Sequence, residues 1–291
     1  MLRTNEHLLE RFPENYARHL VELLSAYQDS GLAPPNLESE VAPGDDGKLW
    51  GHVWEAMLYR HLLNLGFKPQ TAGVTKAGQR GPDFGIMHQG IRIWIEAVTP
   101  APNGIPSDYL EPPKRGVVRV RRVPQEERLL RWTSVLSDKR KKLEYYRTQN
   151  IINATDCTVI AVNSCRLQDY AMNDLGISGL PFAVEAVFPI GPIAFPITTE
   201  GEPAGDPINI TRYTIQKPNK SEVRTGNFLD PNYSNVSAIM GCWQKDMLRN
   251  GIDLTAVHNP LATVSLPRAI LGANKEYVAD QEGDHYMLRS L

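Results

Sequence analysis

The stretch GPDFGIMHQGIRIWIEAV, from Gly81 to Val98, places two carboxylates among apolar residues that are typical of a sheet core. Two runs of strand-forming residues, Asp83–Met87 and Ile91–Val98, flank the turn signal His88-Gln89-Gly90. Short apolar runs that are separated by a glycine turn predict a β-hairpin. The sequence therefore predicts one hairpin with an acid on each strand.

The expected register brings the two acids together. Asp83 falls opposite Glu96 or one residue away, where facing side chains are about 4.5–5.5 Å apart at Cβ. Alternation along the second strand places Glu96 between Trp94 and Val98 on one face. Like charges so placed destabilise a hairpin unless a proton or a cation lies between them, and Mg²⁺ commonly binds one or two carboxylates together with phosphate oxygens. The alternative is that Asp83 is a turn residue and that Glu96 pairs with Arg92 or with a neighbouring strand.

The segments around the hairpin alternate between helix and strand. Apolar residues at helical spacing predict helices at about Pro13–Tyr27, Lys48–Phe67 and Gln125–Arg147. The β-branched run Cys157–Cys165 predicts a buried central strand. Further strands, turns or extended segments are expected at 181–197, 235–243 and 255–267. This order predicts an α/β fold, with a central mixed β-sheet flanked by helices.

The 291 residues show no composition break, so we expect a single domain. It would comprise an N-terminal helical extension and loop (1–47), a core (about 48–164) and a strand-rich remainder (165–291). The formal net charge of −2 indicates no global basic field, so any nucleic-acid binding must rest on a local patch. Three cysteines without CxxC spacing argue against a disulfide framework or a cysteine zinc site. Neither a signal peptide nor a membrane span is evident, so a cytoplasmic protein is expected.

The residues GPDF and IEAV resemble the motif of the PD-(D/E)XK nuclease superfamily, with Pro82-Asp83 as its first half and Glu96-Ala97-Val98 as its second. The superfamily core is a helix, a hairpin with the acids, a second helix and a further strand, which is the order expected from Lys48 to Ser164. The resemblance implies a restriction-endonuclease-like core and metal-dependent hydrolysis of phosphodiester bonds. It implies that Asp83, Glu96 and the backbone carbonyl of Ala97 bind Mg²⁺ or Mn²⁺, and it favours DNA over RNA as the substrate.

The sequence departs from this motif at Val98, where superfamily members carry a lysine. The long helix after the hairpin offers a replacement, because Lys139 lies on an otherwise apolar helical stripe with Leu129, Trp132, Leu136, Leu143 and Tyr146. A lysine on such a stripe is unusual unless it reaches water or meets a carboxylate. Some superfamily members carry the lysine on this helix, which implies that role for Lys139, with Lys142 as the second choice. The alternative is that Lys139 lies at the margin of a solvated face.

Glu55 is a further candidate, because superfamily members often supply an acid to the metal site from the helix before the hairpin. Alternatively, Glu55 is a surface acid that pairs with Arg60 or His52.

A basic segment, KRGVVRVRR, follows the acids at 114–122. Contacts to a phosphate backbone are assigned to Lys114, Arg115, Arg119, Arg121 and Arg122, together with Lys142. The alternative is a solvated loop or a guarded edge strand.

Three hypotheses follow from these residues. The first is a metal-dependent endonuclease in which Asp83 and Glu96 hold the metal, Lys139 assists the attacking water and Glu55 supports the site. The second is a nuclease-like module that has lost catalysis and serves in binding or assembly. The third is a metal-dependent hydrolase of a small phosphorylated molecule, which would need a closed pocket. A homodimer or a protein partner is compatible with each of them.

Overall fold

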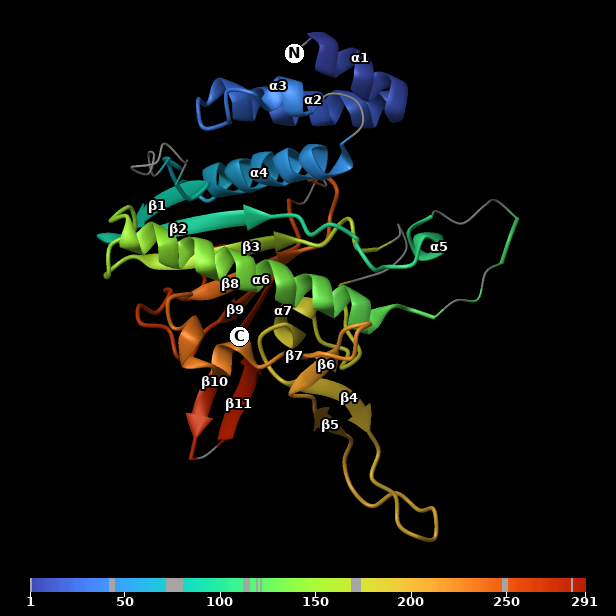
Figure 1. Cartoon of the computed structure of the whole chain (residues 1–291). Coiled ribbons are helices and arrows are strands. Elements are labelled where there is room, and N and C mark those ends of the chain that lie inside the picture. Colours follow the sequence, from blue (N-terminus) through green and yellow to red (C-terminus); the bar gives the residue numbers. More distant parts are fainter. Residues whose placement is uncertain are drawn as a thin grey trace.

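The computed structural model describes residues 2–41, 45–71, 81–111, 116–118, 120, 122–168, 174–247, 251–283 and 285–291. Its centre is a seven-stranded mixed sheet in the order β1-β2-β3-β8-β9-β10-β11 (Figure 1). These strands are β1 (Phe84–His88), β2 (Ile91–Val98), β3 (Cys157–Asn163), β8 (Ala238–Cys242), β9 (Thr255–His258), β10 (Lys275–Glu282) and β11 (His285–Ser290). The predicted α/β class is therefore confirmed.

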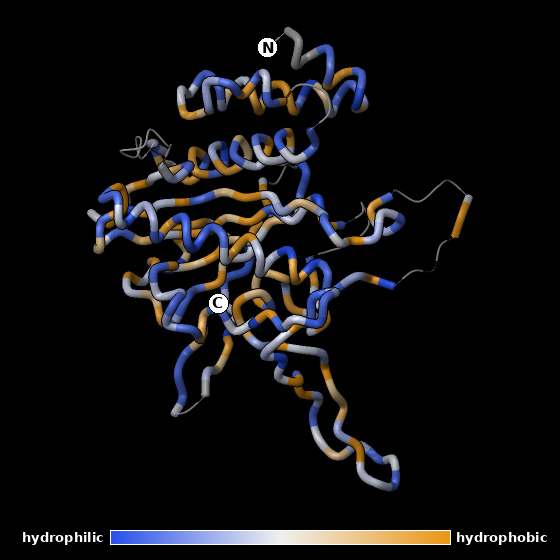
Figure 2. The backbone as a smooth tube through the Cα atoms, in the orientation of Figure 1, coloured by the Kyte–Doolittle hydropathy of each residue, from blue (hydrophilic) through white to orange (hydrophobic). Residues whose placement is uncertain are grey.

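The sheet combines a parallel centre with antiparallel edges. β2, β3 and β8 run parallel, whereas β1 is antiparallel to β2 and β9 is antiparallel to β8. β10 is parallel to β9, and β11 closes the sheet as an antiparallel edge strand. Apolar residues are concentrated along the central strands (Figure 2). All residues of β3 and β8 are buried, as strands with both faces covered require.

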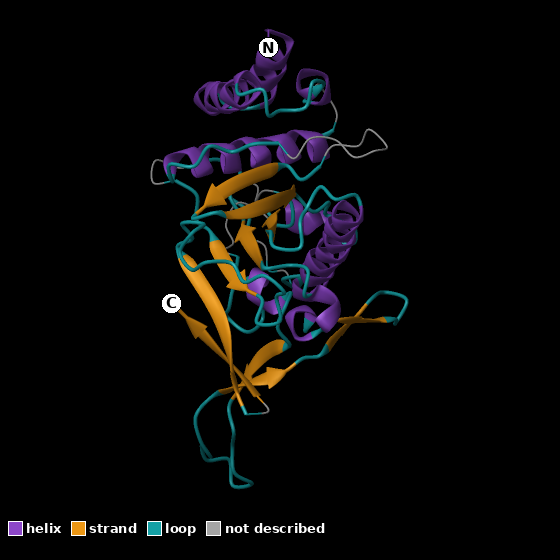
Figure 3. Ribbon diagram, turned by 90° about the vertical axis from the view of Figure 1, so that its left-hand side faces the viewer, coloured by secondary structure: helices purple, strands orange, loops and turns teal. Residues whose placement is uncertain are grey.

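Helices cover both faces of the sheet (Figure 3). One face of the sheet shares a hydrophobic core with the four N-terminal helices. These are α1 (Leu2–Arg11), α2 (Glu14–Asp29), α3 (Leu37–Glu40) and α4 (Asp46–Asn64). The other face packs against α6 (Gln125–Thr148) and α7 (Phe182–Glu185), with α5 (Ser107–Leu110) near the end of β2. Alternation along β2 divides its side chains between these two cores: Ile93 and Ile95 face α4, whereas Trp94 and Val98 face α6. No helix among the described residues is long and apolar enough to cross a membrane.

Helix α4 begins and ends where its sequence directs. The Asp45 carboxylate accepts hydrogen bonds from the N–H groups of Gly47 and Lys48, which caps the first turn. Gly66 adopts a φ of +83° directly after the last turn, as expected of a C-terminal glycine. The Trp54 indole N–H donates to the carbonyl of Ala161 at 3.0 Å and so fastens the helix to β3.

Two sequence expectations need correction. The segment 181–197 was expected as a strand and turn, but Phe182–Glu185 forms the short helix α7 directly after Pro181. Its four residues are all buried against α6 and the sheet, so tertiary packing overrides their strand propensity. The segment 31–47 was expected as a loop, but it contains the helix α3, whose Leu37 is buried.

Smaller elements complete the described chain beyond α7. Two short two-stranded sheets stand apart from the central one: β4 (Ile190–Ala194) pairs with β5 (Ile208–Thr211), and β6 (Thr214–Gln216) pairs with β7 (Glu222–Arg224). Two 3₁₀ turns, η1 (Asn227–Leu229) and η2 (Pro231–Tyr233), lead into β8.

Candidate active site

The β1–β2 hairpin has the register that its sequence predicts. Phe84 faces Ile95 and Gly85 faces Trp94, so one further residue places Asp83 opposite Glu96. The two turn residues, Gln89 and Gly90, both have positive φ angles, as a tight hairpin turn requires. β1 begins at Phe84 and extends to His88, one residue later at each end than expected.

Gly85 leaves the space that the Trp94 ring occupies. A Cβ atom at position 85 would lie 2.4 Å from the Trp94 ring, so the indole can lie across the hairpin only because this residue is glycine. The Trp94 N–H donates to the Asp156 carboxylate at 2.9 Å, which holds the ring in place. Trp94, which lies two residues before Glu96 on β2, is thus held in place on the α6 side of the sheet.

The Glu96 carboxylate is fully buried and accepts hydrogen bonds from two lysines of α6. Lys139 Nζ donates to Glu96 Oε1 at 2.7 Å, and Lys142 Nζ donates to the same oxygen at 2.5 Å. The other oxygen, Oε2, is buried and has no hydrogen-bond partner. Glu96 does not pair with Arg92, which was one alternative to a metal site; the Arg92 guanidinium lies over the Trp94 ring instead. A fully buried carboxylate with two cations on one oxygen and none on the other is an unusual arrangement.

The two lysines differ in their surroundings. The Lys139 side chain is 19% exposed, whereas that of Lys142 is 44% exposed. Burial alone would lower the pKa of Lys142, but the Glu96 carboxylate outweighs it and holds the pKa above its ordinary value. The Lys142 ammonium group is therefore held in its charged form beside a buried acid. The stripe that singled out Lys139 was informative, and Lys142, the second choice, lies at the same carboxylate.

Asp83 is the second acid of the site. Its Oδ2 accepts a hydrogen bond from the backbone N–H of Ala97 at 2.7 Å, which ties the start of β1 to β2. Burial raises the pKa of Asp83 to about 8, the negative charges of Glu96 and Glu55 add to this rise, and Lys139 and Lys142 oppose it. This environment differs from that of an ordinary turn aspartate. Ala97 contributes its N–H here; the expected role of its carbonyl as a metal ligand stays a prediction.

Glu55 approaches the same site from α4. Its Oε2 accepts a hydrogen bond from the Tyr27 hydroxyl at 3.2 Å and lies 3.3 Å from His52 Nδ1. The other ring nitrogen of His52 lies 2.8 Å from Glu40 Oε2. Burial alone would lower the pKa of His52, but the two carboxylates outweigh it and raise that pKa. Glu55 therefore pairs with His52, as the alternative to a metal-site role predicted. Its negative charge also helps to raise the pKa of Asp83.

Sequence reasoning missed the roles of Tyr27 and Glu40. Tyr27 was assigned to a helical core stripe, and Glu40 lay in an expected loop. The spacing of His52 and Glu55 on one helix, three residues apart, was the visible signal for part of this network. Nothing local in the sequence joins Tyr27 or Glu40 to that pair.

The predicted phosphate-contact segment can be followed only in part. Arg122 is exposed. Lys114, Arg115, Arg119 and Arg121 lie outside the described residues. Of the residues assigned to phosphate contacts, Lys142 is therefore the one that the structure connects to the acids.

The donor set fits a cation held by two carboxylates and not a cage built wholly from protein ligands. Among the described residues, no group of three or more histidine, cysteine, aspartate or glutamate side chains is arranged to hold a metal. Mg²⁺, however, usually uses one or two carboxylates and keeps water and phosphate oxygens as its other ligands. The partnerless Oε2 of Glu96, beside Asp83, is a suitable donor for such an ion.

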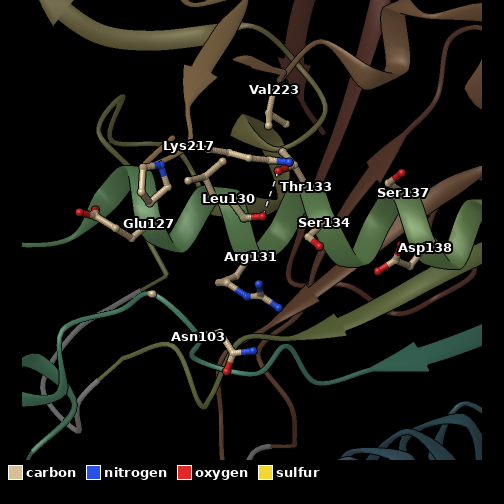
Figure 4. A pocket seen from close by; sticks show the side chains of 12 residues that line it. Asn103, Glu127, Leu130, Arg131, Thr133, Ser134, Ser137, Asp138, Lys217 and Val223 are labelled. Atoms are coloured by element: carbon tan, nitrogen blue, oxygen red, sulfur yellow. Dashed lines mark hydrogen bonds between the residues drawn. The ribbon is translucent and has the colours of Figure 1, made fainter. Parts of the chain in front are cut away.

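The site is distinct from a cavity of about 570 Å³ that is lined by α6, the β6–β7 hairpin and the segment after β2 (Figure 4). That cavity is lined by Asn103, Leu130, Arg131, Ser134 and Lys217, among others, and by none of the acids of the hairpin. The closed pocket that a small phosphorylated substrate would need at the acids is thus not provided by this cavity.

The candidate site rests on its own geometry. Asp83, Glu96, Lys139 and Lys142 lie at one end of the hairpin, and the charge of Glu55 acts on Asp83, although these residues lie up to 87 positions apart, from Glu55 to Lys142. No protein-family model, curated protein or solved structure matches the chain.

Proposed function

We propose that this chain is a metal-dependent nuclease of the PD-(D/E)XK type that hydrolyses phosphodiester bonds, with DNA as the expected substrate. The observation that carries the proposal is Glu96. Its carboxylate is fully buried, holds two lysines on one oxygen, leaves the other without a partner, and faces a second acid whose pKa is raised. Groups with strongly perturbed protonation that gather around a single point are characteristic of catalytic sites.

The order of elements around the acids supports the same proposal. Helix α4 is followed by an antiparallel bridge between Gln70 and Gly85, then by the β1–β2 hairpin, by α6 and by the parallel strand β3. This is the order of a restriction-endonuclease-like core: a helix, a sheet edge with the acids, a second helix and a further strand. The acids lie where β1 begins and β2 ends, between α4 and α6.

The lysine that is missing at position 98 has a spatial replacement. Val98 lies on the face of β2 that packs against α6 and belongs to that apolar core. Helix α6 crosses the same face, so the side chain of Lys139 reaches Glu96 from a different element. A lysine needs only to place its ammonium near the acids, and a four-carbon side chain allows it to do so from a neighbouring helix.

The described side chains divide into complementary roles. Asp83 and Glu96 would hold Mg²⁺ or Mn²⁺, which when bound supplies a Lewis acid and lowers the pKa of a water molecule. Lys139 and Lys142 neutralise charge on the phosphate and orient the water. Glu55 acts through its charge on Asp83, and Asp83 must lose its proton before it can bind a cation.

A cleavage assay tests the proposal. The purified chain is incubated with plasmid DNA, with single- and double-stranded oligonucleotides and with RNA, in Mg²⁺, Mn²⁺ or EDTA. We expect metal-dependent cleavage that is lost in Asp83→Ala while circular dichroism shows an unchanged fold. Asp138→Ala is the matched control, because this exposed acid lies on α6 next to Lys139 and outside the site; it should cleave normally.

A second candidate function is a nuclease-like module without catalysis. It is favoured by the pairing of Glu96 with two lysines, since an ion cluster of this kind can be purely structural. Calorimetric titration with Mn²⁺ separates the two. Absence of cleavage on every substrate, together with absence of metal binding, would contradict the nuclease and support the module.

A further inference from the structure

The β4–β5 hairpin projects from the body of the protein as an arm, which we define as residues 190–211 (Figure 1). Its strands form a two-stranded sheet of their own and do not join the central sheet. All four residues of β5 are exposed. An isolated two-stranded hairpin is marginally stable in water, so an arm of this kind calls for a partner surface.

Both faces of the arm are apolar. Five large apolar side chains are between 48% and 71% exposed: Ile193, Phe195, Ile197, Ile208 and Ile210. Ile193 faces Asn209 and Ala194 faces Ile208 across the hairpin, so alternation places the first three on one face and the last two on the other. Apolar residues recur along the arm (Figure 2). Contiguous exposed apolar surface on this scale marks an interaction site.

Prolines direct how the arm can make contact. Pro192 lies within β4 and Pro196 follows it, and neither has an N–H to offer a further strand. The Asn209 side chain donates to the carbonyl of Gly191 at 3.1 Å and so occupies another backbone group. Edge-to-edge strand addition is therefore disfavoured on β4, and the arm is suited to packing through its side-chain faces.

Charge is separated along the arm. The distal part carries the exposed acids Glu200, Glu202 and Asp206, and residues 190–211 contain no lysine or arginine. The base adjoins the β6–β7 hairpin, where the exposed cations Lys217, Lys220 and Arg224 outnumber the one exposed acid, Glu222. An acidic tip, an apolar middle and a basic base form a surface that complements its own inverted copy.

We propose that the arm joins two copies of this chain in a two-fold symmetric dimer. The two arms pack face to face and antiparallel, so that the acidic tip of each lies against the basic β6–β7 hairpin of the other. One face of each arm, with Ile193, Phe195 and Ile197, is buried against the other arm, and the exposed acids of each tip meet the exposed cations of the β6–β7 hairpin of the other copy.

Sedimentation velocity and light scattering on the full chain test this dimer across a range of protein concentrations. We expect the unmutated chain to be dimeric and Phe195→Glu to raise the dissociation constant by about 30-fold or more, the size of a hot-spot loss. Met287→Glu is the matched control, since Met287 is an exposed apolar residue on β11, away from the arm; it should remain dimeric. A monomeric unmutated chain, or a dimeric Phe195→Glu variant, would overturn the proposal.

A charge exchange makes the test independent of the apolar middle. Reversal of the tip by Glu200→Lys with Glu202→Lys should raise the dissociation constant by about tenfold, because like charges then face each other. Adding Lys217→Glu with Lys220→Glu in the same chain should restore the dimer. Failure of this rescue would refute the antiparallel arrangement. Monomers whose arm binds lipid vesicles or another protein would likewise refute the dimer, and none of these outcomes depends on nuclease activity.

Discussion

Two buried glutamates on the same side of the sheet have opposite environments. Glu185 of α7 is 1% exposed and has each oxygen satisfied: Oε1 accepts from the backbone N–H of Ser178 at 2.7 Å and from its hydroxyl, and Oε2 accepts from Arg212 at 2.8 Å. Glu96 of β2 is 0% exposed, with two lysines on one oxygen and no partner on the other. Burial is thus equal, while hydrogen-bond satisfaction differs.

This difference is the basis for proposing that Glu185 has a structural role and Glu96 a functional one. The chain packs closely around the Glu185 carboxylate, because a Cβ atom at Gly176 would lie only 2.3 Å from it. Around Glu96 the second oxygen is left unpaired next to Asp83, whose pKa is raised. A buried polar atom without a partner costs free energy, so such an arrangement is expected where another ligand completes it. The same Glu→Gln change at both positions therefore makes a matched test.

The largest expected effect is on cleavage in Glu96→Gln. Loss of a metal-binding carboxylate should lower the rate by roughly 10³-fold or more, because the metal contributes several kcal/mol to the transition state. The free energy of unfolding should fall by less than in Glu185→Gln, because the side chains of Lys139 and Lys142 are 19% and 44% exposed, whereas that of Arg212 is 13% exposed. Single-turnover cleavage and urea unfolding measure the two quantities. A large loss of stability would make Glu96 a structural acid like Glu185.

Glu185→Gln should show the reverse pattern. It leaves the Arg212 guanidinium, which is largely buried, without a counter-charge, and removing one partner of a buried pair costs about 3–5 kcal/mol. Urea unfolding would measure this loss. The Mn²⁺ affinity of the remaining folded protein should match that of the unmutated chain. Weakened metal binding by well-folded Glu185→Gln would remove the distinction between the two acids.

Replacement of the two lysines should change the cleavage rate by more similar amounts than replacement of the two acids. We expect Lys139→Met to lower the cleavage rate by about 10²-fold, the effect of losing one charge-stabilising donor, and Lys142→Met to lower it by about tenfold, because Lys142 is more exposed. Rates measured at saturating substrate separate this effect from weaker substrate binding. Equal losses would indicate that the lysines share one role.

The smallest expected effect is a pH dependence of metal stabilisation. The pKa of Asp83 rises from an ordinary 3.8 to about 8 in the folded protein. Its contribution to the stability of the metal-free protein is therefore complete below pH 4 and is lost as the pH rises through 8. Divalent metal binds the deprotonated acid, so the increase in melting temperature with Mg²⁺ should grow from pH 6 to pH 9. Asp83→Asn should abolish this growth; an unchanged profile in that variant would assign it to another group.

Much of the fold and part of the site could be predicted along the chain. The helices at Glu14–Asp29, Asp46–Asn64 and Gln125–Thr148 have apolar periodicity and local end signals. The glycine turn placed Asp83 opposite Glu96 or one residue away, and the observed pairing of Phe84 with Ile95 corresponds to the first of these registers. The apolar stripe singled out Lys139 as a lysine that must reach water or a carboxylate, and the superfamily resemblance implied the hairpin acids as its partners; the 2.7 Å contact places its ammonium at Glu96, and its catalytic role stays a prediction.

Other features depended on contacts between distant segments. Helix α7 forms where strand propensity is high, because its four residues are buried between α6 and the sheet. The arm looks like an ordinary strand-and-turn sequence, and only its separation from the central sheet exposes its apolar faces.

The sequence by itself determined that one hairpin carries two acids opposite each other or one residue apart, because a tight turn and a two-residue side-chain period limit the register locally. It also singled out Lys139 on an otherwise apolar stripe of α6 as a lysine that must reach water or a carboxylate. Only the tertiary structure decided that Lys139 and Lys142 share one oxygen of Glu96, and that Glu55 acts on Asp83. Those relations require α4, β2 and α6 to pack at one point, and packing between elements is not contained in the periodicity of any of them.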